Sequence, residues 1–284
     1  MKNTVFIINP RSAKGKYKEF LTALKTYISE PNYLISQSKE HTATFIKENM
    51  DNYEIFVAVG GDGTISSIAQ YLINTDKILG LFPMGSGNGF GRENNFNHNL
   101  KELLEKLKYG NSKKIDMINI GEEYSVNVSG VGLDSAVANG FENSSRGFLN
   151  YIKISAKTFL QFKGIKVQFK NPELAQYNDN YFMVNIANTR QFGNNAYIAP
   201  QALTNDGKME IALVKKFPLY LAPKFVYQLF TKKLQPSPYL QYITTDECEL
   251  VVDSDLWHID GDAQKITSPI KMKVIPLCLN VLID

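Results

Sequence analysis

The chain has 284 residues, of which 44% are hydrophobic and 21% are charged, a composition typical of globular proteins and not of disordered or fibrous ones. Its net charge of +3 argues against a nucleic-acid-binding protein, because such proteins carry a strongly basic face. This length is comfortable for two domains.

The two cysteines, Cys248 and Cys278, form no metal-binding spacing, so we expect reduced core thiols in a cytosolic protein. The first apolar run, Val5 to Ile8, is short and ends at Asn9, which favours a β-strand over a secretion signal. No apolar stretch approaches the roughly 20 residues needed to cross a bilayer. We therefore expect a cytoplasmic protein, with peripheral contact at the inner membrane face left open.

In the first third of the chain, short apolar runs alternate with helical patterns. The expected strands are 5–8, 33–35, 54–59 and 78–82. The expected helices are 17–28, 42–49, 65–73 and 100–107. This alternation predicts a mostly parallel sheet that is covered on both faces.

From about residue 115, apolar and polar residues alternate as in antiparallel strands with one wet face. Such segments occur at 124–128, 181–187, 209–214, 249–253, 256–260, 271–275 and 279–283. Helices are expected at about 147–162 and 218–233, and a surface loop at 171–180. We predict an α/β domain with a Rossmann-like, mostly parallel sheet (1–118) and a C-terminal β-rich sandwich domain (119–284), whose last strand is free to pack on the first domain.

Two glycine-rich turns follow predicted strands. Gly60 to Thr64 reads GGDGT and precedes a predicted helix, where glycine backbones and a helix N-terminus favour phosphate and Thr64 is placed as the N-cap. The turn from Gly85 holds four glycines in seven residues. A third turn, 9–16, follows the first strand, and ligands bind beyond the carboxyl ends of parallel strands. Together the turns predict one phosphate-binding cleft, although GGDGT alone could be an ordinary turn.

The segments NPRSAKGK (9–16), GGDGT (60–64) and GSGNGFGR (85–92) resemble the catalytic domain of diacylglycerol kinases, sphingosine kinases and similar bacterial lipid kinases. The later segments APQALTNDG (199–207) and IDGD (259–262) extend the resemblance over nearly the whole chain. GGDG is shared with NAD kinases and phosphofructokinases, so it indicates the superfamily and its fold. The later Asp-Gly pairs favour the lipid kinases.

This resemblance implies a kinase that transfers the γ-phosphoryl group of ATP to a lipid hydroxyl, with Mg²⁺ as cofactor and a role in phospholipid biosynthesis. The expected nucleotide-binding residues are Asn9, Ser36, Gly60, Gly61, Asp62, Gly63, Thr64, Ile65, Ser66, Gly85, Ser86 and Asn88. The expected catalytic base is Asp260, which matches the first acid of the family's Asp-Gly-Glu motif. Asp62 is the rival base, and Asp260 could equally be a turn aspartate.

The resemblance also implies a metal site in which Asp206 offers its carboxylate and Leu203 and Lys208 offer backbone carbonyls, although residues 205–207 also form a hairpin signal. Two positions depart from the family pattern. Gly89 replaces the usual Asp after Asn88, and Asp262 replaces the Glu of the Asp-Gly-Glu motif.

Residues 215–233 interleave aromatic and aliphatic residues with five lysines, and 148–169 show a similar mixture. The pattern suits contact with an anionic membrane, but we favour a core-facing helix with a solvated lysine face. The expected partner is a lipid substrate at the membrane surface and not a nucleic acid, with a homodimer left open. Alternatives are a kinase of NAD or of a sugar phosphate, and a non-catalytic nucleotide-binding regulator.

Overall fold

A computed structural model describes residues 3–133, 135–136 and 158–284 of the chain, so most of the helix expected at 147–162 lies outside the described residues. The chain forms two compact units, Met1–Met117 with Pro276–Asp284, and Ile118–Ile275. Two strands, β5 (Ser112–Ile120) and β16 (Ile270–Leu282), have residues in both units. Of the helices that the structure describes, none combines the length and apolarity that a bilayer span requires.

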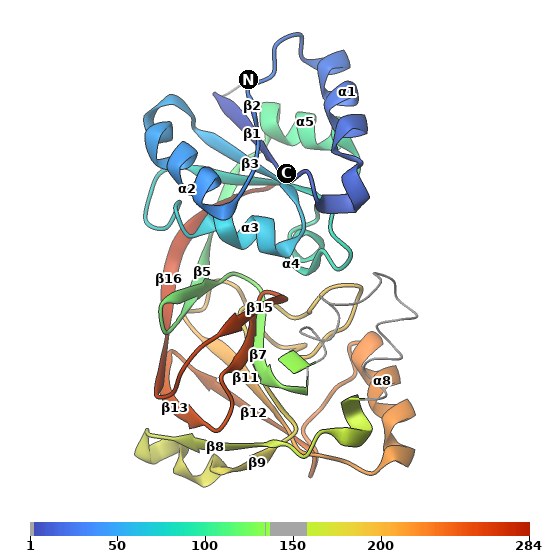
Figure 1. The fold of residues 1–284 in the computed structure, drawn as a ribbon, viewed down its shortest axis with the longest axis vertical. Coiled ribbons are helices and arrows are strands. Elements are labelled where there is room, and N and C mark those ends of the chain that lie inside the picture. The colour runs from blue at the N-terminus through green and yellow to red at the C-terminus, as the bar shows by residue number, and fades with distance from the viewer. Residues whose placement is uncertain (1–2, 134, 137–157) are drawn as a thin grey trace. The chain divides into compact units, whose positions relative to one another are not determined.

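The first unit is built on a parallel sheet with the strand order β2-β1-β3-β4-β16 (Figure 1). Its strands, besides β16, are β1 (Thr4–Ile8), β2 (Tyr33–Ile35), β3 (Ile55–Gly60) and β4 (Ile78–Pro83). Every residue of β1, β3 and β4 is buried, as parallel strands with both faces covered require.

Helices cover this sheet through apolar stripes, such as Phe20 and Leu24 of the first helix and Leu103 and Leu107 of the last. The α-helices of the first unit are α1 (Tyr17–Tyr27), α2 (Lys39–Glu48), α3 (Asp62–Ala69), α4 (Gly89–Glu93) and α5 (Leu100–Tyr109). Two short 3-10 helices are η1 (Ser12–Gly15) and η2 (Met50–Asn52). The expected parallel α/β arrangement is confirmed.

The second unit contains two antiparallel sheets that enclose a core around Trp257, Ile211 and Leu250. One sheet has the order β12 (Leu240–Thr245), β11 (Met209–Val214), β10 (Met183–Ala187), β7 (Val128–Gly132), β14 (Leu256–Ile259) and β15 (Asp262–Lys265). The other contains β16, β13 (Glu247–Val252), β8 (Ile165–Phe169) and β9 (Asp179–Tyr181), with β5 and β6 (Glu123–Ser125) alongside. The expected β-rich sandwich is confirmed.

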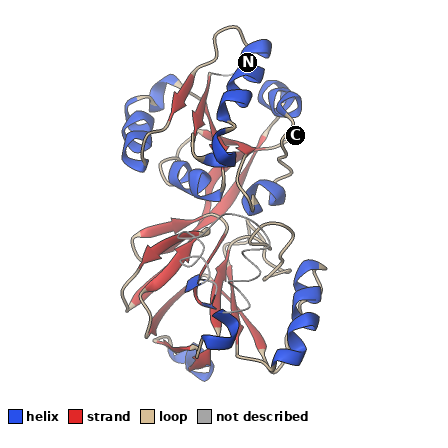
Figure 2. Ribbon diagram, turned by 45° about the vertical axis from the view of Figure 1, so that its right-hand side comes forward, coloured by secondary structure: helices blue, strands red, loops and turns tan. Residues whose placement is uncertain are grey.

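Figure 2 shows that strands dominate the second unit, with one longer helix, α8 (Ala222–Phe230), along its side. A 3-10 turn, η4 (Leu219–Leu221), leads into this helix. The helix predicted at 218–233 is therefore shorter than expected. Pro218 and Pro223 lie at or before its first turn, and at the other end Lys232 takes a left-handed conformation (φ 59°) that closes it.

Several expected boundaries are wrong. The segments 271–275 and 279–283 form one strand, β16, which continues through Pro276 and through Leu277, whose conformation is left-handed (φ 48°). Residues 181–187 are divided between β9 and β10, and the pattern 124–128 is broken after Ser125. The expected surface loop 171–180 contains a 3-10 helix, η3 (Pro172–Tyr177), which buries Leu174.

Cys248 and Cys278 are both free and buried, as the sequence predicts. Burial raises the pKa of the Cys248 thiol to about 12 and that of the Cys278 thiol to about 11. Both groups are therefore held in the neutral thiol form at physiological pH.

Candidate functional site

Three turns of the first unit meet beyond the carboxyl ends of β1, β3 and β4. Asn9 follows β1 directly, and its Nδ2 donates a hydrogen bond of 3.0 Å to Oγ1 of Thr64, in the turn region after β3. The N–H of Met84, which follows β4, donates a bond of 2.6 Å to the carbonyl of Gly60. The structure therefore brings together the three turns that the sequence singles out.

The turns after β3 and β4 touch through their glycine backbones. A Cβ atom added at Gly85 would lie 2.6 Å from Cα of Gly61, which is closer than real Cβ contacts come. A Cβ added at Gly61 would lie 3.1 Å from Cα of Gly85. Side chains are therefore excluded from this contact, and backbone N–H groups can approach an anion closely.

Asp62 joins the same two turns by hydrogen bonds. Its carboxylate accepts from the backbone N–H of Gly89 at 3.1 Å and from that of Phe90 at 3.2 Å. These N–H groups belong to the first turn of α4, where the helix dipole favours a negative charge. The sequence predicts Asp62 near a phosphate or a magnesium ion, whereas in the structure its carboxylate caps the N-terminus of α4.

Thr64 is not the N-cap of α3, which corrects the sequence-based expectation. Gly61 is the N-cap, and the intrahelical bonds begin with the N–H of Thr64 donating to the carbonyl of Gly61. The Thr64 hydroxyl instead accepts the bond from Asn9. The first N–H groups of α3, from Asp62 and Gly63, lie before these bonds and are those that a helix offers to an anion.

The remaining expected nucleotide residues have mixed surroundings. Ile65 is fully buried, so only its backbone can serve a nucleotide. Asn88 is buried, and its side chain closes its own turn by accepting from the N–H of Gly85 at 2.8 Å and donating to the carbonyl of Gly85 at 2.9 Å. Ser86 is exposed in that turn. Ser66 lies within α3 and its hydroxyl donates to the carbonyl of Asp62.

Ser36 lies just past the carboxyl end of β2, and its N–H donates to the carbonyl of Ile8 in β1. Its hydroxyl is 2.7 Å from that of Thr42 in α2. Ser36 is thus at the same edge of the sheet as the three turns, which is the position that the sequence predicts for a ligand.

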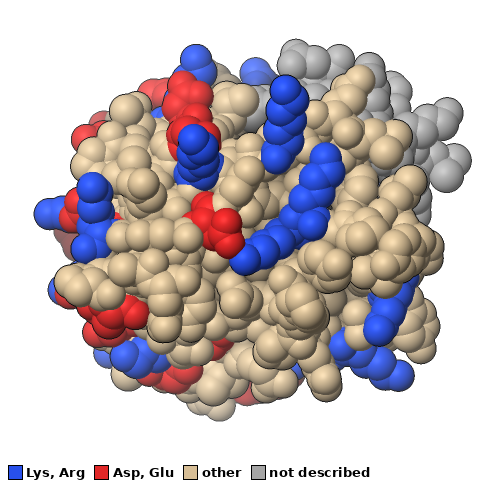
Figure 3. Space-filling model, turned by 90° about the horizontal axis from the view of Figure 1, so that it is seen from below, with Lys and Arg blue, Asp and Glu red and all other residues tan. Residues whose placement is uncertain are grey.

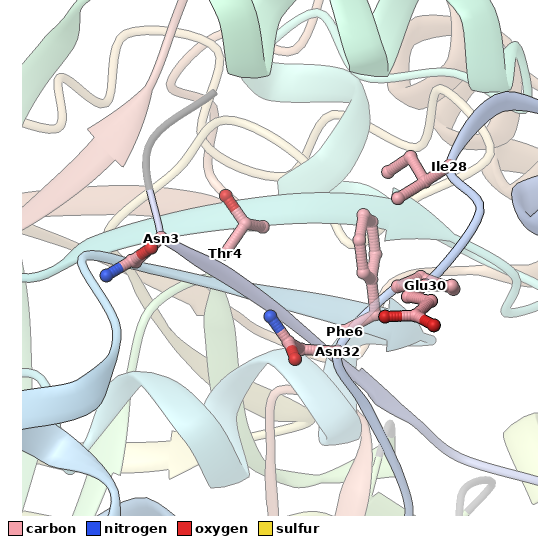
Figure 4. A pocket seen from close by; sticks show the side chains of 7 residues that line it. Asn3, Thr4, Phe6, Ile28, Glu30 and Asn32 are labelled. Atoms are coloured by element: carbon pink, nitrogen blue, oxygen red, sulfur yellow. The ribbon is translucent and has the colours of Figure 1, made fainter.

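A cavity of about 150 Å³ lies elsewhere in the first unit (Figure 4). It is lined by Asn3, Thr4, Phe6, Ile28, Glu30, Pro31 and Asn32. These residues include the amino end of β1, whereas Asn9 follows its carboxyl end. The cavity is therefore not part of the site formed by the three turns.

In the second unit, Asp260 occupies the two-residue turn between β14 and β15. Asp260 (φ 49°) and Gly261 (φ 93°) both have positive φ, and Ile259 pairs with Asp262, which is the geometry of a type I′ hairpin. The Asp-Gly pair therefore does serve as a turn. The Asp260 side chain is nonetheless only 4% exposed, which is unusual for a turn aspartate.

The Asp260 carboxylate is held by three donors from the bend between β6 and β7. Oδ1 accepts from the Ser125 hydroxyl at 2.7 Å and from the N–H of Asn127 at 2.9 Å, and Oδ2 accepts from the N–H of Val126 at 2.9 Å. The Ser129 hydroxyl donates to that of Ser125 at 2.8 Å and accepts from the N–H of Asp260 at 3.1 Å. Three such donors favour an ionised, fixed carboxylate.

Sequence reasoning missed the partners of Asp260. Around it lie buried polar residues that hydrogen-bond to one another or to the bend: Ser125, Asn127, Ser129, Asn188 and Thr189. A signal was available, because polar residues at 125, 127 and 129 alternate with Val126 and Val128. Small polar side chains on one strand face can mark a wet face or a buried polar cluster, and only the structure distinguishes them.

The segment expected to bind a metal precedes β11. Asp206 is exposed, and its Oδ1 accepts a bond of 3.0 Å from the N–H of Lys208. The Lys208 ammonium is 3.1 Å from Asp246 Oδ1. The pKa of the nearby Glu210 carboxyl is raised above its ordinary value. Burial is the main cause and the charge of Asp206 adds to it, while a hydrogen bond from Thr244 opposes the shift.

Within the described parts of the chain, no group of three or more His, Cys, Asp or Glu side chains could enclose a metal ion. This segment presents one exposed carboxylate, that of Asp206, and Mg²⁺ is commonly held by one or two carboxylates while it keeps several water ligands. The residues present therefore fit a hydrated magnesium ion but not a closed metal site.

Two family models match the chain. The diacylglycerol kinase catalytic domain matches residues 3–120, and the YegS C-terminal NAD kinase beta sandwich-like domain matches residues 127–283. These ranges include the three turns of the first unit and Asp260 of the second.

Individual relatives agree with these models. A diacylglycerol kinase of Staphylococcus aureus is 26% identical over 76% of this chain and 71% of its own length. A Streptococcus pneumoniae relative is 25% identical over 97% of this chain and 96% of its own length. A YegS-like protein of Alcanivorax borkumensis is 24% identical over 60% of this chain and 58% of its own length.

Solved structures show the same fold. The crystal structure of a diacylglycerol kinase from Bacillus anthracis superimposes with a TM-score of 0.74 at 16% identity, covering 100% of this chain and 97% of that one. Because the two family models together match nearly the whole chain, the chain belongs to the diacylglycerol kinase catalytic-domain family, whose members are phosphotransferases with an alcohol group as acceptor.

Proposed function

We propose that this protein is an ATP-dependent lipid kinase that transfers the γ-phosphoryl group of ATP to the hydroxyl of diacylglycerol or a related lipid. The observation that carries the proposal is the contact between Gly61 and Gly85, which leaves a side-chain-free backbone surface beside the N-terminus of α3. Such a surface suits phosphate groups. Relatives named diacylglycerol kinase support a lipid as the acceptor.

In this proposal the first unit binds the triphosphate. The N–H groups of Asp62 and Gly63 would donate to phosphate oxygens, and the side chains of Asn9, Ser36 and Ser86 would lie beside the nucleotide. Magnesium, when bound, would offset the charge that develops on the phosphoryl oxygens, and Asp62 is the carboxylate nearest to the proposed phosphate site. Asp206 in the second unit is the carboxylate that we expect at a separate metal site, where it would hold a hydrated ion.

Asp260 is our proposed general base. The attacking hydroxyl must lose its proton, and a fixed, ionised carboxylate can accept it. The bonds from Ser125, Val126 and Asn127 favour that ionised form and fix its orientation. Asp62 is the rival candidate, and in the structure its two oxygens accept the N–H groups of Gly89 and Phe90 at the start of α4.

The experiment that tests the function is transfer of label from γ-labelled ATP to a panel of acceptors. The panel contains diacylglycerol, a sphingoid base, ceramide and phosphatidylglycerol in detergent micelles, with NAD and a sugar phosphate as soluble alternatives. We expect magnesium-dependent labelling of one lipid. Labelling of NAD or the sugar phosphate would move the protein to another branch of the superfamily, and nucleotide binding without any transfer would favour a regulator.

The proposal places the lipid substrate at a membrane surface, with the protein in the cytoplasm and in peripheral contact with the inner membrane face. Fractionation of cells that express the tagged chain tests this location. We expect the protein to divide between the soluble and membrane fractions, and release from membranes by salt would indicate peripheral attachment.

A further inference from the structure

The helix α8 carries apolar residues on the side that faces solvent. Val226, Tyr227 and Phe230 are 48%, 58% and 40% exposed, and Pro223 is also exposed. These four residues, which we call the outer stripe, have the spacing i, i+3, i+4 and i+7, and this spacing places them along one face of a helix.

A different face of α8 packs on the core of the second unit. Ala222, Phe225 and Leu229, also at helical spacing, contact the core cluster that contains Val214 and Phe217. The rings of Phe217 and Phe225 are stacked with centroids 5.0 Å apart. The outer stripe is therefore a second apolar face, and it is not needed to attach the helix.

The apolar surface continues before the helix. Leu219 and Tyr220, in η4, are 58% and 78% exposed. Exposed apolar residues that occur singly are ordinary, but five large ones fall within the short segment Leu219–Phe230. Such a group of exposed apolar side chains is typical of a surface that binds another protein or a membrane.

The charge of the surface around α8 indicates which kind of partner binds there. From Ile211 to Thr245 the sequence contains five lysines and no Asp or Glu. Lys224, Lys232 and Lys233 are exposed within or just after α8. In Figure 3, described Asp and Glu residues appear on the left and at the centre, whereas the right-hand part, where α8 lies in Figure 1, shows Lys and Arg but no red atoms.

Lys232 and Lys233 flank the end of the helix. Lys232 takes a left-handed conformation (φ 59°), and the N–H of Lys233 donates to the carbonyl of Gln228 at 2.9 Å, which closes the helix. Their ammonium groups lie 4.5 Å from the ring centre of Tyr197 and 5.8 Å from that of Tyr227, respectively. Favourable interaction with the helix dipole explains lysines here, but it does not explain the exposed aromatic and aliphatic side chains.

We infer that the outer stripe of α8, with Leu219, Tyr220 and the flanking lysines, docks onto an anionic phospholipid bilayer. Aliphatic and aromatic side chains would enter the interfacial region, while the lysines contact lipid phosphates. The absence of acidic residues from 211 to 245 matches a negatively charged surface. The inference rests on the proposed lipid kinase function for its choice of a membrane as partner.

Vesicle flotation tests this inference with the full chain and with phosphatidylcholine vesicles that contain or lack phosphatidylglycerol. The apolar variant is Val226→Ser with Tyr227→Ser, and its control is Tyr27→Ser, since Tyr27 on α1 is also 58% exposed. The charge variant is Lys232→Gln with Lys233→Gln, and its control is Lys101→Gln with Lys108→Gln on α5.

We expect the wild type to float with the anionic vesicles. The charge variant should lose roughly fivefold in partitioning per lysine, and the apolar variant at least about tenfold. Both controls should float like the wild type, and thermal unfolding should confirm that all variants are folded. Wild-type-like flotation of both α8 variants would overturn the inference. So would a concentration-dependent dimer that the α8 variants abolish, because the stripe would then belong to a second copy of the chain.

A kinase assay on a short-chain diacylglycerol below its micelle concentration separates this inference from the proposed function. Retained activity of the α8 variants on this dispersed substrate, with lost flotation, supports a docking role. Flotation through α8 by a protein that labels no lipid would reject the kinase proposal and keep the docking surface. Lipid labelling with unaltered flotation of the variants would keep the kinase and reject the surface.

Discussion

The carboxylate of Asp62 accepts a hydrogen bond from the backbone N–H of Gly89, 3.1 Å away, and so ties the two glycine-rich turns of the first unit together. Gly89 has no side chain, so at this position the two turns are joined through the backbone alone. The contact makes Asp62 a residue that holds the two turns of the proposed nucleotide site together.

Replacing Asp62 by Asn tests this role. Asn can accept through one oxygen only, and its amide nitrogen would face a second N–H donor, so one of the bonds from Gly89 and Phe90 is lost. We expect a loss of about 1–3 kcal/mol in the free energy of unfolding and faster amide exchange at Gly89 and Phe90. Unchanged exchange at both amides would show that the cap contributes little.

The contact between Gly61 and Gly85 predicts a graded response to added methyl groups. At Gly85 the new Cβ would lie 2.6 Å from backbone, whereas at Gly61 the nearest backbone atom would be 3.1 Å away. Gly85→Ala should therefore separate the turns and weaken ATP binding more than Gly61→Ala does. Isothermal titration with ATP measures both affinities. Equal affinities in the two variants would contradict the described approach of the turns.

The buried thiols predict how stability depends on alkaline pH. Burial raises the pKa of Cys278 to about 11 and that of Cys248 to about 12, from an ordinary value of 9.0. Between pH 9 and pH 11 the unfolded chain loses these protons while the folded chain keeps them. Stability should therefore fall with pH in this window, by about 1.4 kcal/mol per pH unit for each thiol.

Urea unfolding at pH 8, 9 and 10 measures this slope in the wild type and in a Cys248→Ala, Cys278→Ala variant. Other groups also titrate in this range, so the difference between the two proteins isolates the thiols. We expect the variant to have the shallower slope. Identical slopes would mean that the two thiols titrate alike in the folded and unfolded chains.

Much of the first unit could be predicted from the sequence because its signals are local. Continuous apolar runs mark buried parallel strands, and glycine-rich turns mark the ends of β3 and β4. The N-cap of α3 could not be predicted reliably, because the Thr64 hydroxyl is engaged by Asn9, which lies 55 residues away in the sequence. Long-range partners of this kind leave no local pattern.

The second unit was harder to predict. The strands β5, β8, β12 and β15 were not predicted, although β8 alternates apolar and polar residues between Gly164 and Pro172 and so carries a local strand signal. Asp260 could be singled out only by resemblance and by its Asp-Gly turn. Its burial and its bonds to Val126 and Asn127, more than 130 residues away, required the structure.

The measurement that bears most directly on the proposed chemistry is lipid phosphorylation by Asp260→Asn, compared with Asp255→Asn, a change of an exposed aspartate just before β14. Removal of a general base typically costs 10²–10⁴-fold in rate. ATP affinity, measured in parallel by titration, reports whether the first unit is intact. We predict that Asp260→Asn binds ATP like the wild type but loses at least about a hundredfold in label transfer, and that Asp255→Asn keeps wild-type transfer. Transfer by Asp260→Asn within a fewfold of the wild-type rate would contradict the assignment of Asp260 as the base.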